Sequence, residues 1–333
     1  MWSIVMSLVE KVEQRIKEQI NSETQVLDLK IDLLEYINSS IGLFNKENEN
    51  KDSVETHKFR LVELDKQDAL LVQMPNINES GFYAGIVALY SYIKKFHPDL
   101  KVEIIDPVID YFYLNPPDKS SDFFNALNTY AKQGQHKLLF NYKEFYDIFN
   151  NFVSRYIEKC EPTIFGFSII DGNIDASLAM ADLIKAKYPD IKIAFGGNGI
   201  EKFSFGYLPG SYLIENYKFV DFFVRGDGEE TFVELLKCKK TNEELKQIPG
   251  LIWWDEDKKI IYNPPRTNIN MDILPYPDYS PLEDNFYYKS TYRYNVPIVM
   301  SRGCPYRCSF CSVPEYIPQF RHRNVDSVIE EIE

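Results

Sequence analysis

Residues 191–197 read Ile-Lys-Ile-Ala-Phe-Gly-Gly, an apolar run that ends in two glycines. The run is short and stops at residues suited to a tight turn, which predicts a strand buried on both faces. Just before it, apolar residues recur every three or four positions from Ile174 to Ile184, so residues 174–188 are predicted to form an amphipathic helix. A helix that leads into such a strand is typical of a parallel α/β sheet.

The same alternation extends outward in both directions. Helices are predicted at residues 85–96 and from after Glu230 to about Lys237, and each lies beside an apolar run. The sequence therefore predicts an α/β fold with a doubly wound parallel sheet, Rossmann-like and more particularly flavodoxin-like. The further predicted strands are 69–75, 101–106, 163–169 and 219–225.

Glycines and polar residues gather where these strands end, and sheets of this kind bind ligands at the carboxyl ends of their strands. Glycine lets a bulky ligand approach the backbone, but a tight strand-to-helix turn requires the same residue. The chain lacks both G-x-G-x-x-G after its first strand and G-x4-G-K-[ST], so the dinucleotide and P-loop fingerprints are absent. The candidate ligand-binding residues are Asn76, Ser168, Asp171, Gly172, Gly196, Gly197, Asn198, Gly226, Asp227 and Gly228.

Three of the five cysteines, Cys304, Cys308 and Cys311, share one short stretch with the spacing C-x3-C-x2-C. Thiolates are the ligands of iron–sulfur clusters, and three of them leave one iron of a four-iron cluster open. Zinc is the alternative, although only His322 is near enough in sequence to be a fourth ligand. The odd number of cysteines and the lack of a secretory signal argue against a disulfide.

The cysteine spacing, with the aromatic Phe310 directly before the third cysteine, resembles that of the radical S-adenosylmethionine (radical SAM) enzymes. The resemblance implies that Cys304, Cys308 and Cys311 bind a 4Fe–4S cluster, that S-adenosylmethionine chelates its fourth iron, and that Phe310 lies near the adenine. It also implies reductive cleavage of S-adenosylmethionine, hydrogen abstraction from an unactivated carbon, and an electron donor such as flavodoxin or ferredoxin.

Residues from about 65 to 265 resemble the cobalamin-binding domain that precedes one branch of those enzymes. The resemblance rests on residues 191–197, on V-R-G-D-G-E at 224–229, on I-P-G-L-I-W at 248–253 and on L-P-Y-P-D-Y at 274–279. It implies that the strand-end residues contact cobalamin and that a methyl group passes to a peptide, natural-product or lipid-like substrate. Residues 76–81 hold no histidine in place of D-x-H-x-x-G, which implies a cobalt without an imidazole from this domain and leaves open a sheet that binds nothing.

Four segments are predicted along the chain. Residues 1–58 are a helical extension with a polar linker, and residues 59–265 are the cobalamin-type domain, which ends in a β-hairpin. Residues 266–295 are a linker, and residues 296–333 are the truncated start of a radical SAM barrel: a buried strand at 296–300, the cysteine loop, and a helix capped by Asn324. One βα unit is far short of a barrel, so we expect a fragment that is inactive by itself.

Composition narrows the classes of partner. A formal net charge of −13 argues against nucleic acid as the main partner. No apolar run approaches the roughly 20 residues of a membrane span, and the first residues lack a signal-peptide pattern, so the expected compartment is the cytoplasm. The rival hypothesis to a radical SAM enzyme is a non-catalytic module that carries a corrinoid or an iron–sulfur cluster.

Overall fold

The chain is described here in a computed structural model. The predicted extension at 1–58 and three candidate ligand-binding residues, Asn76, Asp171 and Gly172, lie outside the described residues. The structure describes residues 64–72, 74, 84–105, 153–170, 173–200, 214, 217–283, 297–311, 313, 317 and 319–333.

The described residues belong to two structural units. Those of the larger unit lie within Leu64–His322, and those of the smaller unit lie within Arg323–Glu333. The smaller one consists mainly of helix α16, Val325–Ile332, which buries Val328 and Ile329. The Asn324 side chain accepts a hydrogen bond from the Asp326 backbone N–H at 2.9 Å and so caps this helix. The predicted cap is therefore confirmed.

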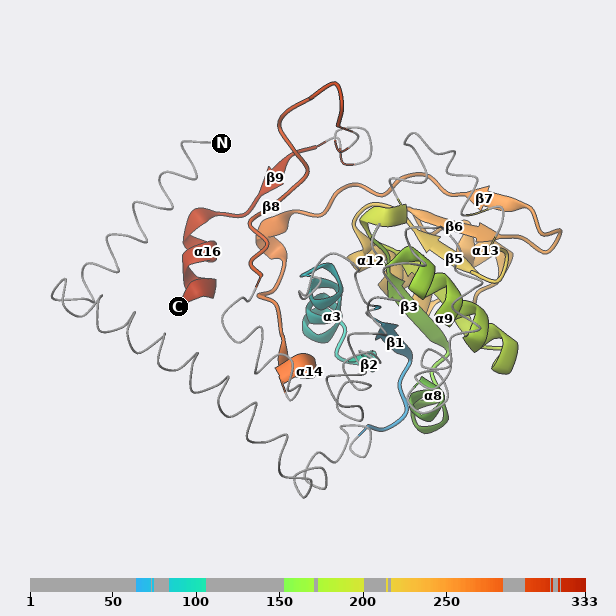
Figure 1. Ribbon diagram of the computed structural model, residues 1–333. Helices are drawn as coiled ribbons and strands as arrows, with labels where there is room; N and C mark the ends of the chain where they lie inside the picture. Colours follow the sequence, from blue (N-terminus) through green and yellow to red (C-terminus); the bar gives the residue numbers. More distant parts are fainter. Residues whose placement is uncertain are drawn as a thin grey trace, which may run out of the picture. The chain divides into compact units, whose positions relative to one another are not determined.

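A seven-stranded sheet organises the larger unit, in the order β2-β1-β3-β4-β5-β6-β7 (Figure 1). The first five strands in this order pair in parallel, which confirms the predicted flavodoxin-like sheet. The predicted hairpin is also present, and its strands β6 and β7 extend the sheet antiparallel to β5. The strands are β1 Ala69–Val72, β2 Val102–Ile105, β3 Ile164–Ser168, β4 Lys192–Gly196, β5 Phe222–Val224, β6 Leu251–Trp254 and β7 Ile260–Tyr262.

Helices connect and cover the strands. α3 and α9 match the predicted helices to within one residue at each end, and they lie on opposite sides of β3 in Figure 1. The longer helices of this unit are α3 Ala84–Phe96, α9 Ile174–Lys187 and α12 Gly228–Lys237, and the shorter ones are α8 Ser154–Cys160, α13 Asn242–Leu245, η4 Met271–Ile273 and α14 Ser280–Glu283.

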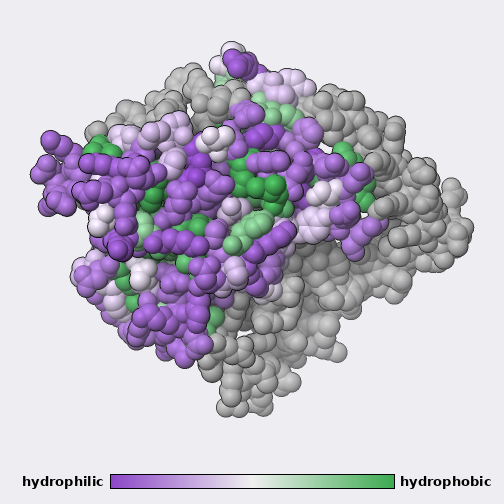
Figure 2. All heavy atoms as spheres, turned by 180° about the vertical axis from the view of Figure 1, so that it is seen from behind, coloured by the Kyte–Doolittle hydropathy of each residue, from purple (hydrophilic) through white to green (hydrophobic). Residues whose placement is uncertain are grey.

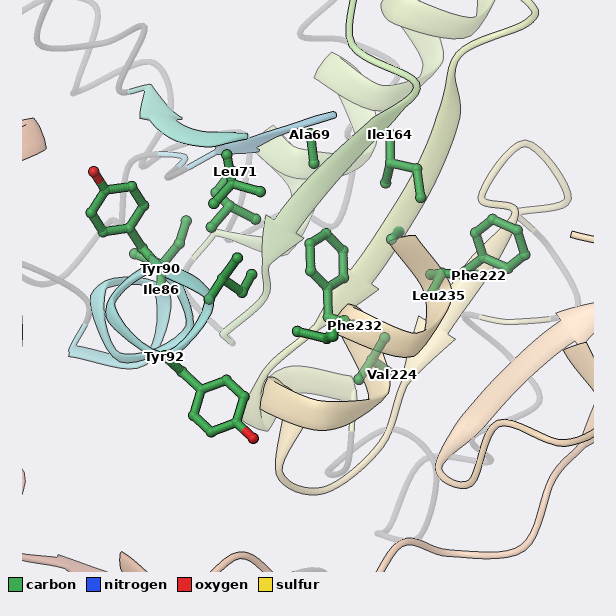
Figure 3. Close-up of a cluster of buried hydrophobic side chains, with 14 of the residues drawn as sticks. Ala69, Leu71, Ile86, Tyr90, Tyr92, Ile164, Phe222, Val224, Phe232 and Leu235 are labelled. Atoms are coloured by element: carbon green, nitrogen blue, oxygen red, sulfur yellow. The ribbon is translucent and has the colours of Figure 1, made fainter. Parts of the chain in front are cut away.

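One face of the sheet forms a core with α3 and α12. Figure 3 shows Ile86 of α3 and Phe232 of α12 on the sides of their helices that face the sheet, where Leu71 lies. At Gly166 an added Cβ would lie 3.2 Å from the Phe232 ring, so the absence of a side chain there lets α12 pack closely. This burial fixes α12, and with it the turn from β5 into α12, against the sheet.

Side chains alternate along a strand, so the residues between these core positions point to the opposite face. That face carries a row of phenylalanines with ring centroids 5.2 to 6.3 Å apart, within the usual range for aromatic pairs. The row runs across three neighbouring strands and so ties them together. Its members are Phe165, Phe167, Phe195 and Phe223.

The segment before the cysteines differs from the prediction. A buried strand was expected at 296–300, but residues 297–300 form no strand and Met300 is exposed. The strand β8 is instead Ser301–Arg302, and it pairs antiparallel with β9, Arg321–His322. A strand needs a neighbour with which its backbone can form hydrogen bonds, and among the described strands none pairs with residues 297–300.

On the face drawn in Figure 2, the hydrophobic residues form small patches separated by hydrophilic ones. Within the described ranges, no helix combines the length and the apolar character needed to cross a membrane.

Candidate functional site

Two strand-end loops of the sheet, those after β3 and β4, are hydrogen-bonded to each other. The Ile169 N–H donates to the Gly196 carbonyl at 2.7 Å, and the Gly199 N–H donates to the Ile169 carbonyl at 2.9 Å. Gly197 has a φ of +93°, and a Cβ on it would lie 2.7 Å from the Ile169 carbonyl oxygen. Glycine at this predicted ligand-binding position is thus required by the contact between the loops. Asn198, beside it, is exposed.

Asn173 holds the loop after β3 and was not singled out from the sequence. Its side chain is almost fully buried, donates to the Ser168 carbonyl at 2.8 Å and accepts from the Ile170 N–H at 2.9 Å. It also donates to the carbonyl of Met74, which follows β1, at 3.5 Å. Asn173 therefore ties the end of β1 to the end of β3, at the point where the strand order reverses. An asparagine directly before a predicted helix was the available signal.

The third group of predicted residues lies in the turn from β5 into α12. Gly226 has a φ of +72°, and a Cβ on it would have no other atom within 4 Å. Asp227 is the residue before α12, yet its side chain does not cap that helix. Both of its carboxylate oxygens accept hydrogen bonds from elsewhere instead, from two arginines and from the Ile269 N–H.

Those two arginines flank the cysteine loop. Arg302 ends β8 and donates to Asp227 at 2.8 Å and to Glu229 at 2.5 Å. Arg321 begins β9 and donates to Asp227 at 2.5 Å and to the Ile269 carbonyl at 3.0 Å. We call Asp227, Glu229, Arg302 and Arg321 the four-charge cluster. The exposed fractions of their side chains are only 10, 4, 18 and 11%, respectively.

The partners in the four-charge cluster stabilise each other's charged forms. Burial by itself raises the pKa of Asp227, but the hydrogen bond from Arg321 and the charge of Arg302 outweigh burial and leave this pKa below its usual value. Burial likewise tends to lower the pKa of Arg302, and the charges of Glu229 and Asp227 outweigh it and raise this pKa. Asp227 and Arg302 are therefore charged at neutral pH.

The three cysteines of the loop between β8 and β9 differ in exposure. Cys308 is exposed, Cys304 and Cys311 are half-buried, and none of the three forms a disulfide. The Cys311 N–H donates to the Cys308 carbonyl at 3.0 Å, which closes a turn between the last two cysteines. Phe310, the predicted S-adenosylmethionine contact, is 86% exposed.

The loop has the donor set of an iron–sulfur site, since three free thiols within one short loop fit the ligands that such clusters take. Within the described residues, however, no group of three or more Cys, His, Asp or Glu side chains is already arranged to hold a metal ion. The prediction that the three cysteines bind a cluster therefore rests on their chemistry and their spacing in the sequence, and it stays a prediction.

The neck of the loop is tightly packed. Gly303 has a φ of +81°, and a Cβ on it would lie 2.5 Å from the Gln319 carbonyl oxygen. The Gln319 side chain in turn accepts a hydrogen bond from Asn268 at 3.1 Å. Glycine directly before the first cysteine is thus required by the geometry of the neck.

The remaining cysteines and the described histidines lie elsewhere. Cys160 is fully buried in α8, and burial raises its pKa to about 11, which keeps this thiol protonated. Cys238 donates to the Leu235 carbonyl at the end of α12. His97 follows α3, and His322 lies in β9. Neither histidine belongs to a loop after one of the parallel strands.

No protein-family model matches the chain. A protein named uncharacterized methyltransferase PH0819, from Pyrococcus horikoshii, is 30% identical over 182 residues, which are 54% of this chain. An anaerobic magnesium-protoporphyrin IX monomethyl ester cyclase from Cereibacter sphaeroides is 32% identical over 36% of the chain. The cobalamin-dependent radical SAM methyltransferase TokK from Streptomyces tokunonensis is 24% identical over 45% of it. The matches span only 38, 20 and 22% of the lengths of these three relatives.

Among solved structures, the cobalamin-dependent S-adenosylmethionine radical enzyme OxsB has a similar fold. Its structure with aqua-cobalamin and S-adenosylmethionine matches 80% of this chain and 31% of its own with a TM-score of 0.57 and 21% identity. The sequence similarity and the shared fold agree with each other and with the order of elements described above. The chain is thus similar in sequence to a cobalamin-dependent radical SAM methyltransferase, and similar in fold to a cobalamin-dependent S-adenosylmethionine radical enzyme.

Proposed function

We propose that this chain serves a radical SAM enzyme in which Cys304, Cys308 and Cys311 hold a 4Fe–4S cluster and the carboxyl edge of the sheet holds cobalamin. The observation that carries the proposal is a loop of three free thiols joined by the buried four-charge cluster to the end of β5. Once bound, the cluster and cobalamin would supply reductive cleavage of S-adenosylmethionine and methyl transfer to an unactivated carbon.

The residues of this chain would bind and orient these cofactors. Phe310 extends from the cysteine loop into solvent and offers an apolar surface for the adenine ring. The open surroundings of Gly226 and the exposed Asn198 would admit cobalamin to the ends of β4 and β5. Two further predicted contacts lie beside them, since Ser168 ends β3 and Gly228 begins α12 directly after the β5 turn.

For the reaction we propose methyl transfer to a peptide or natural-product substrate. Two of the relatives above are named methyltransferases, and one of these names also specifies cobalamin. Cyclisation is the second candidate, because another relative with 32% identity is named a cyclase. A flavodoxin or a ferredoxin would supply the electrons, and the cytoplasm is the proposed compartment.

Anaerobic reconstitution of the full chain with iron and sulfide tests the cluster. We expect bound iron and sulfide, a broad thiolate-to-iron absorption band, and the loss of both in Cys308→Ala. Cys238→Ala is the matched control, because this half-exposed thiol lies outside the loop and its loss should leave the iron content unchanged. Bound zinc without sulfide, or an unchanged iron content in Cys308→Ala, would contradict the cluster.

Titration with hydroxocobalamin tests the sheet. A shift of the corrinoid spectrum that saturates at one equivalent is the expected result, and Asn198→Trp should weaken binding by filling the exposed strand-end loop. No spectral change would reduce the sheet to a scaffold. Formation of 5′-deoxyadenosine from S-adenosylmethionine by the intact enzyme separates the enzyme hypothesis from the non-catalytic cofactor carrier.

A further inference from the structure

The four-charge cluster joins two parts of the chain that are far apart in sequence. Arg302 and Arg321 stand at the two ends of the cysteine loop and are directly opposite each other in the β8–β9 pair. Asp227 and Glu229 come from the turn and the first helical residues after β5. Both ends of the loop are therefore attached to the carboxyl end of one strand of the sheet.

The two carboxylates have a specific electrostatic task. Like charges directly opposite each other in a β-ladder repel, so the Arg302–Arg321 pair by itself would push β8 and β9 apart. Asp227 hydrogen-bonds to both arginines, and Glu229 accepts two hydrogen bonds from Arg302, at 2.5 and 3.3 Å. Because the cluster is largely buried, loss of either acid would leave a guanidinium charge without full compensation.

The backbone of the segment that follows the hairpin takes part as well. Ile269 gives its N–H to Asp227 and its carbonyl to Arg321, at 2.8 and 3.0 Å. Asn268, the preceding residue, bonds to Gln319 at the neck of the loop. The acidic pair is thus the centre of a hydrogen-bond network that reaches the loop through Arg302, through Arg321 and through residues 268–269.

We propose that Asp227 and Glu229 are positioning residues for the cysteine loop: they close its neck and hold it at the carboxyl end of β5. The proposal rests on the proposed function of the loop as the cluster site. It gives Asp227 a different role from the cobalamin contact expected from the sequence. In this role the acidic pair sets the spacing between the cluster and a ligand bound at the edge of the sheet.

Trypsin digestion of the metal-free full chain tests the positioning role. Arg307 lies between the first two loop cysteines, and its side chain is exposed. Cleavage of the chain after it needs the loop to unfold locally, so the rate reports how often the loop opens. We expect Asp227→Asn and Glu229→Gln to speed this cleavage about tenfold to a hundredfold, because each leaves a buried charge unpaired. Mass spectrometry of the fragments measures the rate at this one bond.

Glu230→Gln is the matched control. Glu230 adjoins Glu229 in sequence and forms an ion pair with Arg266 at 2.9 Å. Among the interactions described, neither Glu230 nor Arg266 contacts the cysteine loop. The Glu230→Gln substitution should therefore leave the rate of cleavage after Arg307 unchanged. Alkylation of the buried Cys160 shows whether a variant loosens the whole sheet, and we expect no change there. Equal rates in the acidic variants and the control, or parallel exposure of Cys160, would overturn the proposal.

Arg302→Lys gives a second route should an acidic variant fail to fold. Lysine keeps the charge but lacks the planar fork that reaches two carboxylates, so we expect a cleavage rate between those of the wild type and Glu229→Gln. A rate equal to that of the wild type would show that the paired geometry does not hold the loop.

Reconstituted protein gives a readout that a purely structural role would not move. In Glu229→Gln we expect iron loss to a chelator about tenfold faster than in the wild type, and an altered electron paramagnetic resonance spectrum of the reduced cluster. Identical spectra and rates would contradict the positioning role. A wild type that assembles no cluster would refute the proposed function, whereas the trypsin result would still decide whether the acidic pair holds the loop.

Discussion

Single residues of one type take different roles here according to their surroundings. Cys160 is fully buried in α8, whereas Cys308 is exposed in a loop. Iron–sulfur ligands must be thiolates, and burial opposes the charge that a thiolate carries. The environment thus separates a structural thiol from a candidate ligand, which the residue type alone does not.

The pH dependence of stability should show the buried thiol. Because the folded pKa of Cys160 is raised from 9.0 to about 11, the unfolded chain loses this proton first as the pH rises. The thiol therefore contributes stability below pH 9, which is lost between pH 9 and 11. Urea unfolding of the wild type and of Cys160→Ala should give free energies that converge across this window. A constant difference would contradict the assignment.

Asn173 and Asn198 form a matched pair of asparagines on neighbouring strand-end loops. Asn173→Ala removes three hydrogen bonds from a buried position and should lower the free energy of unfolding by about 1–3 kcal/mol. Asn198→Ala, at an exposed position, should change it by less than about 0.5 kcal/mol. Thermal or urea unfolding measures both, and equal effects would show that Asn173 does not hold its loop.

At the scale of elements, the loops after β3 and β4 act as one platform. Backbone hydrogen bonds join the two loops. They can approach this closely because Gly197 has no side chain to collide with the Ile169 carbonyl. The glycine of the β5 turn differs, because Gly226 also has a positive φ but has no atom within 4 Å of its Cβ position. One glycine serves packing between loops, and the other leaves open space.

Alanine substitutions should separate these two glycines. Gly226→Ala should lower the free energy of unfolding by about 1–2 kcal/mol, the usual penalty for a left-handed residue that has a Cβ. Gly197→Ala carries the same penalty and a clash with the Ile169 carbonyl, and should lose about 1–3 kcal/mol more. Melting curves measure both losses. Equal losses would mean that the two loops separate freely.

On the scale of the whole chain, the contact that matters most brings residues 227 and 229 against residues 302 and 321. The larger unit, Leu64–His322, contains all four, so the sheet and the cysteine loop belong to one structural unit. The four-charge cluster has a formal net charge of zero, because its two carboxylates balance its two guanidiniums. Such a cluster gives specificity of placement in addition to stability.

Acid should weaken this contact. The folded pKa of Asp227 is below its usual 3.8, so its ionised form stabilises the fold above that pH, and this contribution is lost as the pH falls through the lower folded value. Wild type and Asp227→Asn should therefore differ in unfolding free energy at pH 6, and this difference should shrink below about pH 3.8. Urea unfolding at several pH values measures it. A difference that persists unchanged in acid would argue against the ionised pair.

The parallel strands were predictable because each is a continuous apolar run that ends at turn residues, as 191–197 shows. The strand predicted at 296–300 was wrong because an apolar run does not determine whether neighbouring strands are available to pair with it. Asn173 and the four-charge cluster were missed for a related reason. Polar side chains acquire their partners only when distant segments meet.

The sequence by itself determined the order of the parallel strands and of the helices between them, the flavodoxin-like sheet and the three cysteines of the loop, because hydrophobic period, turn chemistry and ligand spacing are local properties. Only the tertiary structure decided that the hairpin extends the sheet, that Asn173 joins two strand ends, and that Asp227 faces two arginines. These facts depend on contacts between segments up to 99 residues apart, which electrostatics and packing select and no short stretch of sequence records.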